Sequence, residues 1–335
     1  MQAIVLDAPH QPVVLREMPT PTPGPDEVLI RVRAAALNHR DIWIQQGQYG
    51  GIRLPCILGA DGAGLVAALG SNVRADAPEV GSRVVIYPGL EWGDNPRVQA
   101  KTFRVLGMPD PGTFAEYILC PARYVCRMPE HLSFEEAAAL PLAGLTAYRA
   151  AFVRAHAQPG DRVLVTGIGG GVALLAAQLC AARGCAVWAT SGSDDKLSRA
   201  REMGILGGVN YHAEGWAQEL VRQAGGLFNV IIDSAAGASY LHLIDVAAPA
   251  GRIVSYGGTL GAVPDLPPAK LFWKQLSLLG STMGTKQDFE AMLALVSEKH
   301  ITPVVDKVLP LAEAEAAFRY LETGQQFGKV VLKID

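Results

Sequence analysis

A glycine-rich segment, Thr166-Gly167-Ile168-Gly169-Gly170-Gly171-Val172, stands between two apolar stretches. Glycines at a strand-to-helix turn let the backbone approach a phosphate closely, and the helix N-terminus supplies free N–H groups and the positive end of its dipole. The spacing is GxxGxxA rather than GxGxxG, and glycine-rich turns also occur for steric reasons alone. We predict that this turn binds a dinucleotide pyrophosphate through Gly167, Gly169, Gly170, Gly171 and Val172.

The end of the next apolar stretch indicates which dinucleotide would bind. An NAD site needs a carboxylate there, about twenty residues after the glycines, to hold the adenosine ribose 2′-hydroxyl. Here the stretch ends in hydroxylated residues, and Lys196 follows one helical turn later. Hydroxyls and a lysine would bind a 2′-phosphate, which a carboxylate would repel. Ser193 is also a suitable helix N-cap, and both roles can hold at once. The sequence therefore predicts NADP, bound at Ser191, Ser193 and Lys196.

The middle of the chain, residues 126–283, has the pattern of the sheet that these residues need. Apolar stretches alternate with helical ones and are Arg162–Thr166, Ala186–Thr190, Gly208–Tyr211, Asn229–Asp233, Arg252–Tyr256 and Leu276–Gly280. Strands buried on both faces and separated by helices indicate an α/β fold with a doubly wound parallel sheet. Tyr211 and Gly257, at the ends of two of these strands, complete the predicted cofactor-binding set.

The two ends of the chain have a different composition. Residues 1–125 contain short β-like stretches broken by Gly and Pro, which is typical of a β-rich, barrel-like domain. Residues 284–335 contain two helical stretches and a closing apolar strand, too little to fold alone. We therefore expect one domain from 1–125 with 284–335, and a cofactor domain from 126–283.

The composition excludes several classes of protein. The 335 residues are 50% apolar and 18% charged, with a net charge of −3, which suits a globular chain of two domains. No basic run suggests nucleic acid or a membrane surface, and neither a signal peptide nor a membrane span is evident. Five cysteines without a CxxC pair indicate reduced thiols. We expect a cytoplasmic protein whose partner is a small-molecule substrate.

Six short motifs in order along nearly the whole chain resemble the medium-chain dehydrogenase/reductase superfamily. They are Pro21–Ile30, Ala36–Asp41, Leu58–Val66, Gly112–Tyr117, Leu140–Tyr148 and Gly328–Leu332. The resemblance implies a GroES-like β-barrel catalytic domain made from both chain ends, with a Rossmann domain between them. It also implies that Thr146 lies close to the nicotinamide ring.

The departures from that family concern zinc. Its zinc alcohol dehydrogenases carry a Cys where this chain has Asn38, a His–Glu pair where it has Ala60-Asp61, and a Cys or equivalent where it has Leu142. Alanine and leucine cannot coordinate zinc, and no cysteine lies between residues 87 and 113, where a structural zinc lobe would fall. We therefore expect no metal, as in the zinc-free quinone-oxidoreductase branch that the chain resembles.

Without a metal, hydrogen-bond donors must orient a carbonyl group for hydride transfer. By resemblance, Asn38 and Tyr49 are the candidate catalytic donors and Trp43 an apolar wall, although Tyr49 could be an ordinary loop aromatic. Asp41 fits a structural role better than that of a general acid, and His39, lacking a second ligand, is interpreted as a packing or surface residue.

The predicted reaction is hydride transfer from NADPH to a quinone, an enone or enal, or another small carbonyl compound. Two alternatives stay open. One is a zinc-independent alcohol or aldehyde reductase, and the other is a protein that binds NADPH for a structural or sensing purpose.

The last predicted strand of the sheet, within 276–282, is an edge strand with apolar residues on both faces. Exposed apolar edges are usually paired or covered. Relatives in the superfamily pair this strand across a two-fold axis, so we predict a homodimer. In the alternative, residues 264–273 or the C-terminal tail cover the edge of a monomer.

Overall fold

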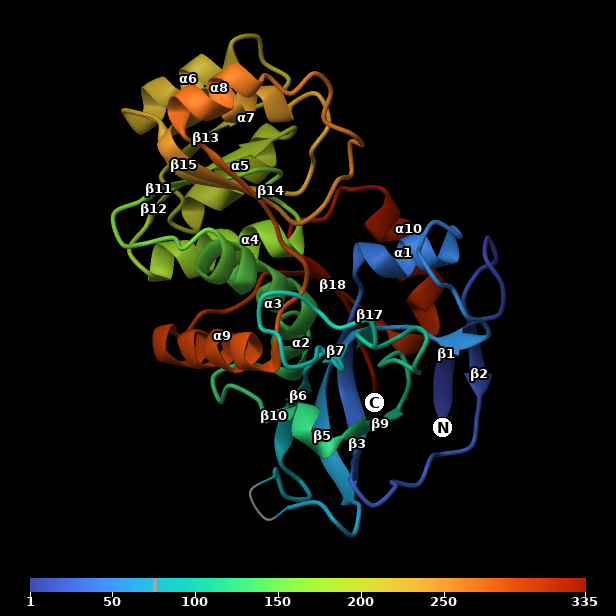
Figure 1. Cartoon of the computed structure of the whole chain (residues 1–335). Helices are drawn as coiled ribbons and strands as arrows, with labels where there is room; N and C mark the ends of the chain where they lie inside the picture. Colours follow the sequence, from blue (N-terminus) through green and yellow to red (C-terminus); the bar gives the residue numbers. More distant parts are fainter. Residues whose placement is uncertain (75–76) are drawn as a thin grey trace. The chain divides into compact units, whose positions relative to one another are not determined.

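The computed structural model describes residues 1–74 and 77–335, which divide into two units (Figure 1). The first unit contains residues 1–143 and 284–335, and the second contains 144–283. Residues 126–143, which the sequence analysis assigned to the cofactor domain, group with the first unit, because β10 (Val125–Arg127) pairs with β6 and α2 (Phe134–Ala138) packs on β3 and β5. In the described part of the chain, every helix is too short or too polar to cross a lipid bilayer.

The first unit is β-rich. Within its described residues, a seven-stranded sheet has the order β10-β6-β5-β3-β18-β17, with β9 also pairing with β3. Neighbouring strands are antiparallel, except that β17 and β18 are parallel. Smaller sheets join β2-β1-β4 and β7-β8. The strands are β1 (Gln2–Leu6), β2 (Val14–Glu17), β3 (Glu27–Ala36), β4 (Cys56–Ile57), β5 (Asp61–Leu69), β6 (Arg83–Ile86), β7 (Gly89–Leu90), β8 (Arg104–Val105), β9 (Tyr117–Pro121), β10, β17 (Val305–Pro310) and β18 (Lys329–Lys333).

Strand β18 brings the C-terminal segment into the middle of this sheet. It pairs with the end of β3, with Val331 opposite Ala36, and the Leu37 N–H donates to the Val330 carbonyl at 3.0 Å. The helices of the unit are α1 (His39–Gln45), α2, α9 (Lys286–Lys299), α10 (Ala314–Glu322) and the start of α3 (Pro141–Tyr148). Helix α1 follows the end of β3, and β3 lies between β5 and β18 in the sheet. The starts of α1, β5 and β18 therefore lie side by side.

The second unit, all of whose residues are described, has a six-stranded parallel sheet in the order β13-β12-β11-β14-β15-β16. This is the strand order of a Rossmann fold, so the predicted doubly wound sheet is confirmed. The strands are β11 (Arg162–Val165), β12 (Ala186–Ser191), β13 (Gly207–Asn210), β14 (Phe228–Asp233), β15 (Ala247–Ser255) and β16 (Ser277–Gly280). The helices are the rest of α3, a π-helix (Arg149–Arg154), α4 (Gly171–Ala182), α5 (Asp194–Glu202), α6 (Trp216–Ala224), α7 (Tyr240–Val246) and α8 (Pro268–Lys274).

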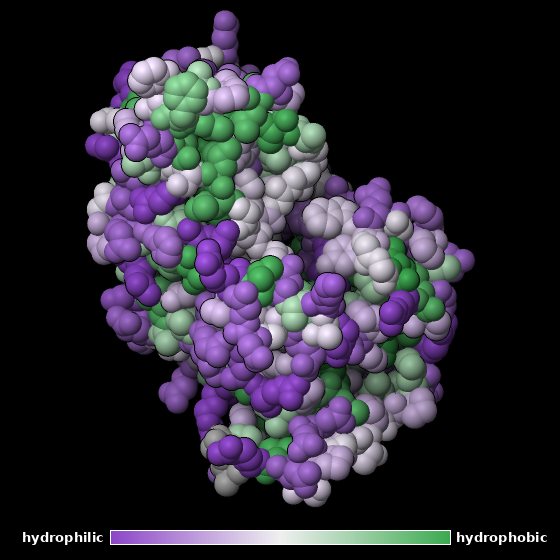
Figure 2. Space-filling model, viewed as in Figure 1, coloured by the Kyte–Doolittle hydropathy of each residue, from purple (hydrophilic) through white to green (hydrophobic). Residues whose placement is uncertain are grey.

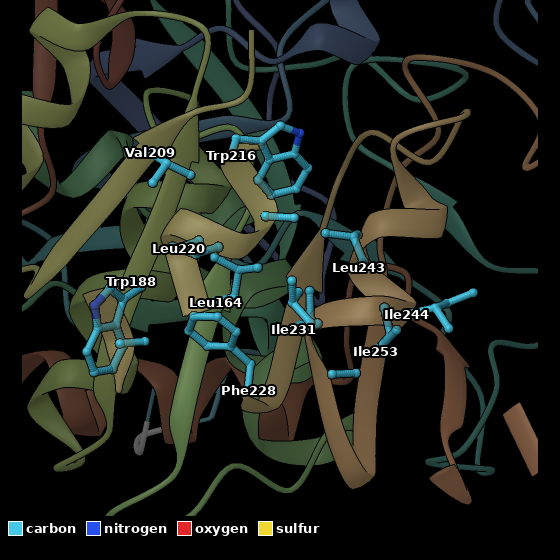
Figure 3. Packing of buried hydrophobic residues seen from close by; sticks show 14 of the residues in the cluster. Leu164, Trp188, Val209, Trp216, Leu220, Phe228, Ile231, Leu243, Ile244 and Ile253 are labelled. Atoms are coloured by element: carbon cyan, nitrogen blue, oxygen red, sulfur yellow. The ribbon is translucent and has the colours of Figure 1, made fainter. Parts of the chain in front are cut away.

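Apolar side chains hold the helices α6 and α7 to one face of this sheet (Figure 3). Leu164 and Ile231 of the central strands point toward Leu220 of α6 and Leu243 of α7, and all four are at most 2% exposed. Burying one such side chain stabilises the fold by about 1.5–3 kcal/mol. The end of the central strand β11 of this packed sheet leads into the glycine turn.

Candidate active site

The glycine turn lies between β11 and α4, and its backbone depends on glycine. Gly167 and Gly169 have φ angles of +65° and +133°, which residues with side chains rarely adopt. Gly170 is the N-cap of α4, and a Cβ atom placed on it would meet nothing within 4 Å. The Ile168 N–H donates to the Thr190 carbonyl at 2.8 Å and ties the turn to β12. Gly171 and Val172 form the first turn of α4, so the predicted residues surround an open helix N-terminus suited to an anion.

The tip of β12 brings the predicted hydroxyls and lysine together. The Ser191 hydroxyl accepts the Ser193 N–H at 3.2 Å, and the Ser193 hydroxyl accepts the Lys196 N–H at 3.4 Å as the N-cap of α5. Each hydroxyl is an acceptor in these bonds, so its hydrogen can still be donated. The Lys196 side chain reaches the glycine turn, because its Nζ lies 3.4 Å from the position of a Cβ atom on Gly169.

Two rings complete this tip. The Tyr211 N–H donates to the Ser191 carbonyl at 3.0 Å, and its ring lies 4.6 Å from that of His212. A Cβ atom on Gly192 would lie 2.7 Å from Tyr211 Oη and 2.9 Å from His212 Nε2. Sequence reasoning missed His212, whose only signal was its place next to Tyr211.

The ends of the neighbouring strands are joined by a buried carboxylate. Asp233 at the end of β14, 1% exposed, accepts a hydrogen bond from the Thr166 hydroxyl at 2.7 Å. Gly257 follows β15 where a Cβ atom would lie 2.8 Å from the Ser234 carbonyl oxygen. Thr146 lies in α3 and is 6% exposed. Asp233 had no role in the sequence analysis, and it fixes the strand ends beside the turn.

The first unit holds a buried group of three polar side chains, called the amide cluster below: Asn38, Asp61 and Lys329. Lys329 Nζ donates to Asn38 Oδ1 at 2.7 Å and to Asp61 Oδ2 at 2.9 Å. Asn38 Nδ2 donates to the same Asp61 Oδ2 at 2.9 Å. The three residues are 8%, 0% and 5% exposed, respectively. Sequence reasoning noted Asp61 only as a departure from a zinc ligand set and gave Lys329 no role.

Backbone groups and a second carboxylate support the amide cluster. The Leu142 N–H donates to Asp61 Oδ1 at 2.7 Å, and the Asn38 N–H donates to Asp41 Oδ2 at 2.8 Å at the start of α1. Burial raises the pKa of Asp41 to about 6, although the Arg40 guanidinium 3.8 Å away acts in the opposite direction. Asp41 therefore helps to hold the Asn38 backbone, in line with its expected structural role.

The other predicted catalytic residues lie on or after α1. Tyr49 is half-buried under the Arg40 guanidinium, whose Cζ lies 5.1 Å from the ring centroid. Trp43 is half-buried, with its ring 6.2 Å from that of His39. His39 itself is exposed. The structure thus links Tyr49 to Arg40 and Trp43 to His39, while Asn38 bonds within the amide cluster.

Comparison with known proteins bears on this arrangement. Residues 24–130 match the family model of the alcohol dehydrogenase GroES-like domain, and residues 171–298 match that of the zinc-binding dehydrogenases. The chain is 35% identical to the zinc-type alcohol dehydrogenase-like protein YogA of Leptosphaeria maculans, over 97% of this chain and 95% of that protein. The chain belongs to the medium-chain dehydrogenase/reductase superfamily. The predicted fold class, a GroES-like domain with a Rossmann domain, is confirmed.

Two further relatives of this medium-chain oxidoreductase are informative. A crystal structure described as an NAD-dependent alcohol dehydrogenase superposes with a TM-score of 0.94, 40% identity and full coverage of both chains. An acryloyl-coenzyme A reductase of Sulfurisphaera tokodaii is 29% identical over 99% of this chain and all of that protein. The chain is thus an oxidoreductase of a nicotinamide-dinucleotide-dependent family.

The family description implies zinc, and the residues of this chain do not fit it. Three residues at positions that hold ligands in the zinc relatives do lie together, namely Asn38, Asp61 and Leu142. Leu142, however, contributes only its backbone N–H, and an ammonium group bonds both Asn38 and Asp61. Among the described residues, no group of three or more His, Cys, Asp or Glu side chains is arranged to hold a metal ion. Tetrahedral zinc needs converging nitrogen, sulfur or carboxylate donors.

Proposed function

We propose that this protein is a zinc-independent NADPH-dependent reductase that transfers hydride to a quinone, an enone or enal, or another small carbonyl compound. The observation that carries the proposal is the amide cluster, where the amide of Asn38 stands at a position that holds a metal ligand in zinc relatives and the ammonium group of Lys329 bonds it. A hydrogen-bond donor next to a fixed positive charge can stabilise the negative charge that develops on a carbonyl oxygen.

NADP as the cofactor is supported by the tip of β12. No carboxylate ends this strand, and Ser191, Ser193, Lys196 and the rings of Tyr211 and His212 gather there. NAD is the second candidate, because the 40% identical structure is described as NAD-dependent. Isothermal titration with NADPH and NADH separates the two: at least about tenfold tighter NADPH supports the proposal, since a charge-assisted contact contributes about 1.5–3 kcal/mol.

The substrate class follows from the proposed donors. Asn38 would donate to the carbonyl oxygen, Tyr49 would be a second donor and Trp43 an apolar wall for a flat, conjugated substrate. The relative described as an acryloyl-coenzyme A reductase is named for a conjugated substrate, which favours an enone or enal over a saturated aldehyde.

A substrate panel tests this function. NADPH oxidation is followed with quinones, enones, enals and saturated aldehydes, on protein whose zinc content has been measured and that has been treated with a chelator. Turnover of conjugated carbonyls or quinones that survives chelation supports the proposal. Turnover of saturated aldehydes alone favours the alcohol or aldehyde reductase, and tight NADPH binding without turnover favours a structural or sensing role. One tightly held zinc per chain contradicts the zinc-free assignment.

We also propose a homodimer that pairs through β16. This strand is at the edge of the sheet, and its Leu278 and Leu279 are half-buried. Nearby, α8 has no buried residue, and Phe272 and Trp273 are 63% and 81% exposed. Figure 2 shows hydrophobic side chains on the face of the second unit that carries α8. A pairing partner would cover this apolar surface, and light scattering would give twice the 35.5 kDa chain mass.

A further inference from the structure

The amide cluster uses two of the three hydrogen-bonding groups of the Asn38 side chain. A primary amide has one oxygen acceptor and two N–H donors. In the cluster, Oδ1 accepts from Lys329 and one N–H goes to Asp61. The second N–H is the donor that remains for a further acceptor, and Asn38 keeps 8% of its surface exposed.

The chemistry of its partners allows the Asn38 amide only one orientation. An ammonium group can only donate hydrogen bonds, and an ionised carboxylate can only accept them. Rotating the amide by half a turn would point N–H groups at Lys329 Nζ and the carbonyl oxygen at Asp61 Oδ2. Both contacts would then be repulsive, at distances of 2.7 and 2.9 Å. The ion pair therefore fixes which way the remaining N–H points.

A purely stabilising role explains this pair poorly. Replacing a buried ion pair by apolar side chains is often neutral or stabilising, so burial of Lys329 and Asp61 is weak evidence for a stability function. The two residues come from β18 and β5 and meet a residue 291 positions away from Lys329. Such an arrangement is expected where the direction of a polar group matters.

We propose that Lys329 and Asp61 are positioning residues that lock the Asn38 amide, so that its second N–H is held toward the substrate carbonyl oxygen. This inference rests on the proposed function. Bound NADPH would supply the hydride that bonds to the electrophilic carbon of the substrate, and the carbonyl π-electron pair would move to the oxygen. The Asn38 N–H, polarised by the Lys329 charge, stabilises that oxyanion, which then takes a proton from water. NADPH is oxidised and the carbonyl compound is reduced.

A double-mutant cycle between Asn38 and the ion pair tests the inference. The pair is removed in the charge-neutral variant Lys329→Met/Asp61→Asn, which keeps an oxygen acceptor for the Leu142 N–H and leaves no buried charge unpaired. Asn38→Ala should lower kcat by about 10²–10³, as for the loss of an oxyanion donor. The pair variant should lower kcat at least about tenfold in the Asn38 background. In the Asn38→Ala background it should cost less than about threefold, because residues that act through one group are not additive.

Matched measurements separate positioning from folding. Thermal unfolding and NADPH affinity of the pair variant should stay close to those of the wild type while kcat falls. The control Arg104→Met/Asp110→Asn removes an ion pair of similar length, 2.7 Å, that is about one-third exposed in the same unit, and it should leave kcat unchanged.

The outcomes are distinct. Wild-type protein that turns over no compound of the panel overturns the proposed function itself. Turnover in which the pair variant keeps wild-type kcat, or multiplies its loss with that of Asn38→Ala, overturns the positioning role and leaves the proposed function standing.

Discussion

The two polar sites of this molecule are built in opposite ways. The glycine turn of the second unit, called the cofactor turn below because we propose that it binds NADP, consists of backbone groups and short side chains around an open helix N-terminus, with Lys196 half-buried beside it. The amide cluster of the first unit consists of side chains that are at most 8% exposed, and its ion pair spans 268 residues. Electrostatic interactions are weakened by water at the first site and act in a low dielectric at the second.

The difference has a consequence for substitution. A charge removed at the cofactor turn leaves neighbours that water can solvate, so the loss should be confined to ligand affinity. A charge removed from the amide cluster leaves its partner buried and unpaired, so the loss should include the stability of the fold. The following experiments compare the two sites directly.

The largest expected effect is that of Lys329→Met on stability. It leaves Asp61, 0% exposed, without its counter-ion and should lower the free energy of unfolding by about 3–5 kcal/mol. Lys329→Met/Asp61→Asn should restore most of the loss. Lys196→Met at the cofactor turn should change the free energy by no more than about 0.5 kcal/mol. Urea unfolding followed by tryptophan fluorescence measures the free energy of unfolding of all three variants. An equal loss of this free energy in Lys329→Met and Lys196→Met would contradict the difference expected between the two sites.

A pH dependence from Asp41 comes next. Its pKa of about 6 in the fold lies above the ordinary 3.8, so the folded protein holds this proton more tightly than the unfolded chain. Stability from this group is therefore greatest below pH 4 and falls as the pH rises through 6, by up to about 3 kcal/mol. Asp41→Asn should lose this dependence, whereas Asp195→Asn on the exposed start of α5 should keep it. The free energy of unfolding is measured at several pH values from 4 to 8. An identical pH dependence of this free energy for wild type and Asp41→Asn would contradict the role given to Asp41.

A smaller effect is expected for Lys196→Ala, in cofactor affinity alone. Loss of a charge-assisted contact to the 2′-phosphate should weaken NADPH by about 1.5–3 kcal/mol, at least tenfold, and leave NADH within about twofold. Titration calorimetry with both dinucleotides measures the difference. Equal weakening of NADPH and NADH would place Lys196 near the pyrophosphate instead of the 2′-phosphate.

The smallest effect concerns the edges of the two sheets. Leu278→Lys on β16 should weaken the proposed dimer by about tenfold, or about 1.4 kcal/mol. The control Val308→Lys changes a 45% exposed residue on β17 of the other unit and should leave the assembly unchanged. Sedimentation velocity over a concentration series reads out both variants, and a wild-type chain that remains monomeric throughout rejects the dimer.

Much of the second unit could be predicted from the sequence because its features are local. The glycine turn, the N-cap at Ser193 and the alternation of strands and helices depend on residues a few positions apart. The Ser193 cap bonds a residue three positions away, and the glycines and the apolar stretches are visible as patterns of residue types, which is enough to indicate these features. His212 could not be identified from the sequence, because its position over Gly192 depends on the pairing of β12 with β13.

The amide cluster was decided by tertiary structure. Asn38 was identified by resemblance, but its partners Asp61 and Lys329 come next to it only because β5, β3 and β18 are neighbours in one sheet. The same sheet explains why residues 126–143 join the first unit, since β10 and α2 pack there. Sequence spacing contains no information on the pairing of strands nearly three hundred residues apart, because that pairing is selected by the burial of the whole sheet. The sequence by itself therefore determined the glycine turn that we propose binds a dinucleotide, and the tertiary structure decided which charged groups hydrogen-bond the amide that we propose meets its substrate.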